Sequence, residues 1–177
     1  MSRKRPGSRA ERDRRDRRRS GQVSQVRRLT RERATARDTG RAMSQANVEL
    51  VMKVHTAVIQ GDLEGLLAGV HPQAEYRPAT QQAIEGEGGV FRGHEGIRRW
   101  FGELHDLYED LDSEILEVRD LGDRIVVVFI VRGLGTGSGV TLEQSLAQVV
   151  TLQQEKVIEI REYFSREEAL AAVGLSE

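Results

Sequence analysis

The sequence predicts an α+β fold in which a strongly curved antiparallel sheet wraps around a long helix to form a cone. Apolar residues recur at helical spacing over most of the stretch before Tyr108, and the period changes to two after Asp110. The strand-like segments that follow are joined by short turns, which favours antiparallel neighbours. The open end of such a cone is a natural pocket for a small molecule.

Two helices are expected at the start of the ordered part. The first begins near Ser44 and ends at Gly61, and valines at three- and four-residue spacing mark its buried face. A second, short helix runs from Leu63 to Val70. His71-Pro72 ends it, because the residue before a proline is pushed out of the helical region.

A short strand and the clearest helix of the chain follow. The strand is expected at Ala74 to Ala79, and Gln81 to Val90 is expected to be a loop because it is rich in Gly and Glu. The helix is predicted at Gly93 to Leu107. Its apolar stripe consists of Ile97, Trp100, Phe101, Leu104 and Tyr108.

Four strands and a last helix complete the predicted order. The apolar run in the second of these strands is nearly continuous, so we expect both of its faces to be covered. Ser165 and Glu168 form a capping box for the last helix, and Gly174 stops it. The strands are predicted at Ser113 to Leu121, Arg124 to Arg132, Thr141 to Leu152 and Val157 to Phe164, and the helix at Arg166 to Val173.

Charge divides the 177 residues into two parts. Residues 1–42 hold 16 of the 27 Lys and Arg and 5 of the 28 Asp and Glu, which leaves +11. Residues 43–177 carry the rest, which gives −12 although the whole chain sums to −1. Large aliphatic side chains are rare in the first part, so we predict a disordered basic arm joined to one folded domain at 43–177.

The arm has three interpretations. It is a solvated tail, a segment that contacts nucleic acid through charge alone, or upstream sequence translated from an early start codon, since Met43-Ser44 stands where order begins. Nucleic-acid contact is the least favoured of the three. The acidic domain offers no charge argument for binding nucleic acid.

Composition excludes several classes of protein. The chain has no Cys, which removes disulfides, thiolate metal sites and cysteine nucleophiles. The longest strongly apolar run is Ile125 to Val131, too short to span a membrane. The four histidines are too dispersed for a local ligand motif, so we expect no metal and no cofactor, and a cytoplasmic location.

Several short motifs, in this order and spacing, carry a resemblance to a known family. They are Gly61-Asp62-Leu63-Glu64-Gly65, Tyr76-Arg77-Pro78, Phe91-Arg92-Gly93-His94-Glu95-Gly96-Ile97, Gly122-Asp123-Arg124, Gly137-Ser138-Gly139 and Tyr163-Phe164 with Glu168-Ala169-Leu170 and Gly174-Leu175. From about Ser44 to Leu175 the chain resembles the SnoaL-like branch of the NTF2-like superfamily. The resemblance implies a cone-shaped pocket and commonly a homodimer through the open face of the sheet.

The resemblance also allows the catalytic positions of the ketosteroid isomerases to be compared. Their tyrosine position falls on Val54, their base on Pro78 and their aspartate near Gln148. None of the three residue types matches, so that isomerase activity is not expected, because such sites depend on pKa-tuned groups. The superfamily contains isomerases, cyclases, dehydratases, hydrolases and pure binding proteins, and whether this chain is an enzyme stays open.

Two residues remain as weak catalytic candidates, since cyclase-like members use a strand carboxylate with a histidine. They are Glu143 and His94. Glu143 has the opposite phase to Gln144 and Gln148, so the alternative is a solvated or dimer-face carboxylate. His94 stands at a helix start, where the alternative is a residue that packs over a loop.

The residues expected to line a ligand pocket are aromatic or are polar residues on strands. An inward polar strand residue needs a partner, which makes such residues informative. They are Tyr76, His94, Trp100, Arg132, Gln148 and Tyr163. We therefore expect a SnoaL-like protein that binds a small, largely apolar molecule, and the alternative is a non-catalytic dimeric interaction module of the same fold.

Overall fold

A computed structural model describes residues 43–86 and 89–175. The predicted basic arm at residues 1–42 lies outside the described residues. Residues 43–60 are helical. The elements that follow are α2 (Leu63–Gly69), β1 (Val70–Arg77), α3 (Ala79–Glu85), β2 (Phe91–Arg92), α4 (Gly93–Leu107), β3 (Tyr108–Asp120), β4 (Arg124–Gly135), β5 (Thr141–Gln153), β6 (Lys156–Tyr163) and α5 (Arg166–Ala172).

The strands form one six-stranded sheet in the order β2-β1-β6-β5-β4-β3. The β3–β4, β4–β5 and β5–β6 pairs are antiparallel, as the short turns predict. The β1–β6 pair is parallel, which differs from the expected all-antiparallel sheet. A parallel neighbour follows from the connection, because α3, α4 and the four strands β2 to β5 lie between β1 and β6 and return the chain to the side where β1 began.

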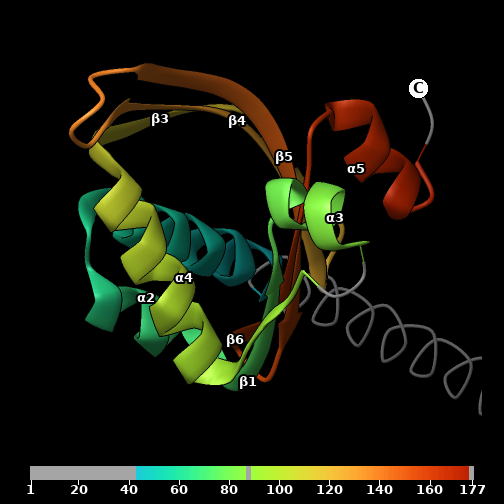
Figure 1. Ribbon diagram of the computed structural model, residues 1–177. Coiled ribbons are helices and arrows are strands. Elements are labelled where there is room, and N and C mark those ends of the chain that lie inside the picture. The colour runs from blue at the N-terminus through green and yellow to red at the C-terminus, as the bar shows by residue number, and fades with distance from the viewer. Residues whose placement is uncertain (1–42, 87–88, 176–177) are drawn as a thin grey trace, which may run out of the picture. The chain divides into compact units, whose positions relative to one another are not determined.

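The sheet curves strongly, and the helices divide between its two faces (Figure 1). The helix of residues 43–60 and α4 lie inside the curve, while α5 lies on the outer side. This arrangement confirms the predicted α+β fold with a curved sheet around a long helix. The predicted span of α4 is also confirmed, and Ser165 caps α5 by accepting a hydrogen bond from Glu168 N–H.

Both faces of the strand β4 are covered, as its continuous apolar run predicts. Ile125, Val127 and Phe129 belong to the inner core with the helices. Val126 and Val128 pack in a second cluster with Ala169 and Leu170 of α5. Alternate residues of one strand therefore belong to two separate apolar clusters.

Two local predictions around β1 are wrong. The strand expected at Ala74 begins earlier, at Val70, and passes through Pro72. The β1–β6 register shifts between Val70 and Glu75, so Pro72 lies where the ladder is interrupted and needs no backbone donor. The second error concerns the expected loop at Gln81 to Val90, because residues 79–85 form α3.

Candidate functional site

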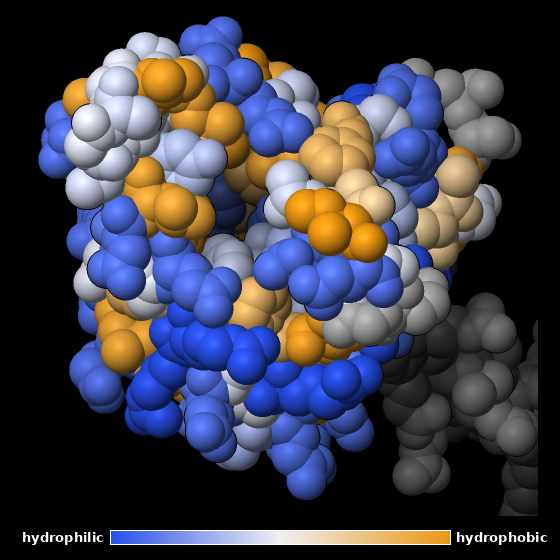
Figure 2. Space-filling view, in the orientation of Figure 1, coloured by the Kyte–Doolittle hydropathy of each residue, from blue (hydrophilic) through white to orange (hydrophobic). Residues whose placement is uncertain are grey.

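A cavity of about 410 Å³ lies inside the curve of the sheet. Its walls come from the helix of residues 43–60, from α3 and α4, and from the inner faces of the strands. In the space-filling view, a hollow opens on the side where α3 and α4 face each other (Figure 2). Most of the wall is aliphatic, including Val54, Ile97, Leu146, Val150 and Ile160.

Glu162 of β6 is the one buried charged residue among those that the structure describes. Its side chain lines the cavity and is 7% exposed. Oε2 accepts hydrogen bonds from Tyr76 Oη and Gln148 Nε2, each at 3.0 Å. Oε1 accepts one from the backbone N–H of Ala79 at 3.2 Å. Three strands and a helix start thus converge on one carboxyl group.

Burial changes the acid–base properties of this group. Desolvation raises the pKa of Glu162 above its ordinary value, and the hydrogen bonds from Gln148, Ala79 and Tyr76 only partly oppose that rise. The pKa of the Tyr76 hydroxyl is raised well above its ordinary value by burial and by Glu162. Tyr76 therefore stays a neutral donor, and Glu162 is a carboxyl group that can gain or lose a proton nearer neutrality than a solvated one.

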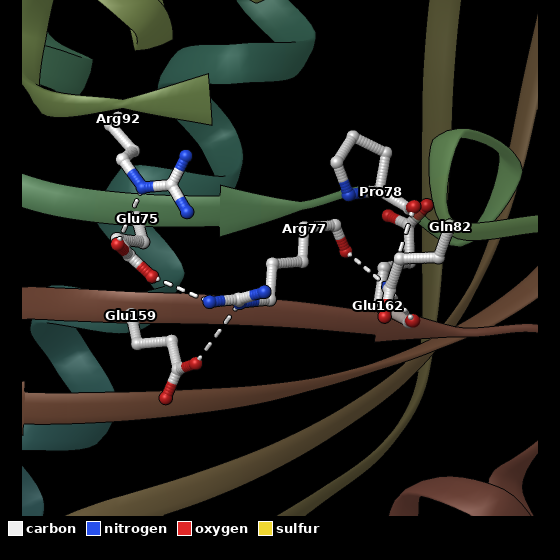
Figure 3. A network of polar contacts seen from close by, with 7 residues as sticks. All are labelled: Glu75, Arg77, Pro78, Gln82, Arg92, Glu159 and Glu162. Carbon is white, nitrogen blue, oxygen red and sulfur yellow. Dashed lines mark hydrogen bonds and ion pairs between the residues drawn. The ribbon is translucent and has the colours of Figure 1, made fainter. Parts of the chain in front are cut away.

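The helix α3 is fixed to the same carboxyl-bearing strand (Figure 3). Gln82 Nε2 donates to the backbone oxygens of Arg77 at 2.9 Å and of Glu162 at 3.2 Å. Pro78 precedes the helix in extended conformation, so the first N–H of α3, that of Ala79, points at Glu162. This short helix depends on long-range partners, which is why local pattern alone did not predict it.

On the opposite face of β1, charged side chains pair with each other. Arg77 bonds Glu75 at 2.8 Å and Glu159 at 3.5 Å, and Arg92 bonds Glu75 at 3.0 Å (Figure 3). These arginines lower the pKa of the Glu75 carboxyl, although desolvation is the largest single influence and acts the other way. Adjacent residues of one strand thus place Tyr76 in the cavity and its neighbours in an ion-pair network outside it.

Three of the six residues expected to bind ligand line the cavity. They are Tyr76, Trp100 and Gln148. The Tyr76 and Trp100 rings meet edge to face with centroids 4.3 Å apart. Gln144 also lines the cavity, opposite Val131 in the β4–β5 register. Trp100 comes from α4, so its position follows from the predicted helical stripe.

The other three lie elsewhere, and the expectation that they line the cavity is not met. Arg132 is paired with Glu143 across the β4–β5 ladder, and its guanidinium bonds Glu143 and Glu114 at 3.0 Å each. Tyr163 packs beside the outer cluster with α5, on the face of β6 opposite to Glu162. His94 Nε2 is 3.1 Å from the Val70 carbonyl oxygen and is bound to the backbone there.

The second catalytic candidate, Glu143, is exposed and bonded to Arg132. Its outward direction agrees with the phase argument from the sequence. The three positions compared with the ketosteroid isomerases, Val54, Pro78 and Gln148, all line the cavity. These three side chains include no carboxyl group and no phenol. In this cavity Glu162 provides the carboxyl group and Tyr76 provides the phenol.

A histidine also lines the cavity. His55, on the helix of residues 43–60, has Nε2 2.8 Å from the Ser113 hydroxyl, and its ring meets Phe129 edge-on at 4.8 Å. Burial lowers its pKa to about 4, so it is neutral at pH 7. The remaining ionisable side chain of the described wall, apart from tyrosines, is Glu103 of α4, which is half exposed and pairs with Arg99 at 3.7 Å.

Sequence reasoning missed Glu162, although a signal existed. Ile160 and Glu162 have the same phase on β6, and Ile160 is an apolar residue that could mark the inward face. The β5–β6 ladder has an irregularity between Thr151 and Leu152, which breaks the alternation counted from the start of the strand. Tyr163, chosen for its aromatic ring, therefore faces outward.

Within residues 43–86 and 89–175, no three His, Asp or Glu side chains are grouped so as to hold a metal ion. In the same part of the chain, every helix is too short or too polar to cross a membrane.

Comparisons with known proteins agree with this geometry. A family model described as a SnoaL-like domain matches residues 51–160. No curated protein sequence matches the chain significantly.

Solved structures show the same fold. TerC, co-crystallised with polyporic acid, has 23% identity and a TM-score of 0.59, with 73% of this chain and 97% of that one covered. An NTF2-like protein from Burkholderia xenovorans LB400 has 28% identity and a TM-score of 0.57, with 72% and 95% covered. A hypothetical protein with a ketosteroid isomerase-like fold from Catenulispora acidiphila DSM 44928, in complex with trimethylamine, has 20% identity and a TM-score of 0.57, with 72% and 94% covered.

Proposed function

This chain belongs to the SnoaL-like domain family, and from that membership we propose that it binds a small, largely apolar molecule in the cavity inside its sheet. The apolar body of the ligand packs against the aliphatic wall. Its polar group meets Glu162. The two fold neighbours crystallised with polyporic acid and trimethylamine support a small-molecule role, because both ligands are small organic compounds.

The observation that carries the proposal is the buried carboxyl group of Glu162. A folded protein gains no stability from a carboxyl group placed beside empty apolar space, because the desolvation of the group is costly. Tyr76, Gln148 and the N–H of Ala79 hold it in one orientation. A pre-oriented polar group in a largely apolar cavity is the usual form of a small-molecule site.

The site limits the chemistry that it can perform. Glu162 is the group able to transfer a proton, since its raised pKa brings it nearer neutrality and the Tyr76 hydroxyl holds it in place by donating to Oε2. Isomerases, cyclases and dehydratases need a positioned proton-transferring group, so these reaction classes fit the cavity better than hydrolysis. An Asp-Arg-Asp arrangement that would hold an attacking water is absent from the described cavity wall.

A thermal-shift and calorimetric titration tests the binding proposal. The probe is 4-tert-butylbenzyl alcohol, which has an apolar body and one hydrogen-bonding group. At a hundredfold its dissociation constant it should stabilise the protein by about 2.7 kcal/mol. Leu104→Trp, which fills the cavity from α4, should abolish the shift.

Leu116→Trp is the matched control, because Leu116 is exposed on β3 and does not line the cavity. It should leave the shift unchanged. A shift that survives in the Leu104→Trp protein would place the ligand outside the cavity and contradict the proposal.

A second candidate is a dimeric interaction module, and exposed apolar side chains favour it. Leu116 is 52% exposed and Phe164 is 43% exposed, and the segments that carry them are joined by the Glu117–Arg166 ion pair. Sedimentation velocity of the wild type and of Leu116→Glu tests this surface. A dimer that dissociates in the variant supports it, and a monomeric wild type rules it out.

A further inference from the structure

The acidic and basic side chains that line the described cavity wall, apart from the histidine and the tyrosines, are all acidic. Glu162 and Glu103 line it, and no Lys or Arg is found among its described lining residues. His55 contributes no positive charge at pH 7, because its pKa is about 4. An anionic ligand would therefore meet two acidic side chains, and the arginine that pairs with one of them, Arg99 with Glu103 at 3.7 Å, does not line the cavity.

Within the described residues, no charged side chain is paired with Glu162. Its three hydrogen-bond donors, the Tyr76 hydroxyl, the Gln148 amide and the Ala79 backbone N–H, are all neutral. Oε2 receives two of these donors and Oε1 receives one, so Oε1 can accept another hydrogen bond. A buried carboxylate without a cation is costly, and a cationic donor is the partner that lowers this cost most.

Two aromatic residues that line the cavity lie beside Glu162. Tyr76 bonds Glu162 directly, and the Tyr76 ring contacts the ring of Trp100 with centroids 4.3 Å apart. Both residues line the cavity. Trp and Tyr rings attract cations close to their faces, and the attraction is strongest away from water. A carboxylate beside an aromatic pair is therefore suited to an ammonium group.

The charge of the whole domain acts in the same direction. Residues 43–177 carry 23 Asp and Glu against 11 Lys and Arg. A net negative domain attracts cations and repels anions at a distance. Glu103 on α4, which lines the cavity and is half exposed, is one of these acidic residues.

We infer that the ligand of this cavity is a hydrophobic amine bound in its ammonium form, with the nitrogen between Glu162 and the Tyr76–Trp100 pair. The inference rests on the proposed function and adds the chemical class of the ligand. The aliphatic wall holds the hydrocarbon part, and an N–H of the ammonium donates to Oε1 of Glu162. Carboxylates and phosphates are excluded by Glu162 and Glu103.

Three probes with one hydrocarbon body separate charge from shape. They are 4-tert-butylbenzylamine, 4-tert-butylbenzyl alcohol and 4-tert-butylbenzoate, titrated calorimetrically against the full chain at pH 7. The amine should bind at least about tenfold more tightly than the alcohol, because a charge-assisted hydrogen bond replaces a neutral one. The benzoate should show no binding.

Two variants test whether Glu162 causes the preference for the amine over the alcohol. Glu162→Gln should reduce the amine-to-alcohol ratio to within about threefold of unity while the alcohol still binds. Glu114→Gln removes an exposed carboxylate that pairs with Arg132 outside the cavity, and it should leave the wild-type amine-to-alcohol ratio unchanged. The wild-type ratio decides the inference even if the Glu162→Gln protein fails to fold.

The outcomes distinguish the two proposals. If the alcohol binds and the amine binds no more tightly, the amine inference is wrong and the binding proposal stands. Binding of the benzoate equal to that of the amine would also overturn the inference, as would a preference that persists in Glu162→Gln. If no probe binds, the proposed function itself fails.

Discussion

Glutamates on the inner and outer faces of the sheet have pKa values that are shifted in opposite directions. On the inner face, Glu162 is buried, its donors among the described residues are neutral, and its pKa is raised by desolvation. On the outer side, Glu117 bonds Arg166 at 2.6 Å and Arg119 at 2.5 Å, and these hydrogen bonds lower its pKa. The pKa values of these two glutamates thus shift in opposite directions because one is buried beside neutral donors and the other bonds two arginines.

The arginines explain the difference. Those of the outer face form ion pairs with neighbouring carboxylates, as Arg132 does with Glu114 and Glu143. None of the described arginines lines the cavity. Ion pairs on the wet face contribute little each, whereas a lone carboxyl group in an apolar cavity is costly and therefore points to function.

The largest expected effect is the loss of stability when a leucine is truncated in the apolar cluster between the sheet and α5, compared with the same truncation in the cavity wall. Leu170 of α5 is 2% exposed and lies in the cluster with Val126 and Val128. Leu170→Ala should lower the free energy of unfolding by about 2–5 kcal/mol. Leu146→Ala should cost less, because Leu146 already borders empty space. Urea denaturation of both variants measures this, and equal losses would argue against an open cavity beside Leu146.

The next effect is acid destabilisation through His55. Its pKa is about 4 in the folded protein and about 6.5 when solvated, so the unfolded chain binds the proton first as the pH falls. Stability should be lost between pH 6.5 and pH 4, by on the order of 3 kcal/mol. Urea titrations across this range should show a weaker dependence in His55→Gln. An unchanged pH profile would refute the burial of a neutral His55.

A smaller effect comes from the cavity carboxyl group. Tyr76→Phe removes one donor to Glu162 and should cost about 1–3 kcal/mol. The raised pKa of Glu162 means that the folded state holds its proton more tightly, so its contribution to stability falls as the pH rises above about 4.5. That fall should steepen in Tyr76→Phe and vanish in Glu162→Gln. A Tyr76→Phe protein with wild-type stability at every pH would show that the hydrogen bond is not formed.

The smallest effect is expected on the outer side. Glu117→Gln weakens two arginine contacts that are partly exposed, and the loss should be about 1 kcal/mol or less. It should shrink further in 0.5 M NaCl, since salt screens exposed charges. Thermal melts with and without salt measure it. If Glu117→Gln lowered the stability as much as Tyr76→Phe does, the proposed difference between the two faces of the sheet would be contradicted.

Local signals predicted the fold well. The stripe of α4 and the short turns of the meander depend on neighbouring residues, so the pattern alone located Gly93–Leu107 and the strands from β4 to β6 with small end errors. The helix α3 could not be found in this way. Its first turn is held by Glu162 and its Gln82 bonds the backbone of β6, about eighty residues away.

The site was harder to predict because it depends on register. Arg132 lies opposite Glu143 and Val131 lies opposite Gln144. The phase of Glu143 was predicted as outward, but only the pairing shows that Arg132 shares that face. Glu162 was missed for a related reason, since the irregular β5–β6 ladder shifts the alternation along β6.

The central claim is that Glu162 is a buried carboxyl group that binds a cationic ligand. The titration of the Glu162 carboxyl group tests this claim most directly. The carboxyl carbon of Glu162 can be followed by NMR with ¹³C-labelled glutamate, assigned by comparison with Glu162→Gln. Tyr76 is the titratable group that faces it. We predict a pKa above 4.5 in the free protein, moving downward when 4-tert-butylbenzylamine is added. A Glu162 pKa at or below the ordinary value, unchanged by the amine, would contradict the account.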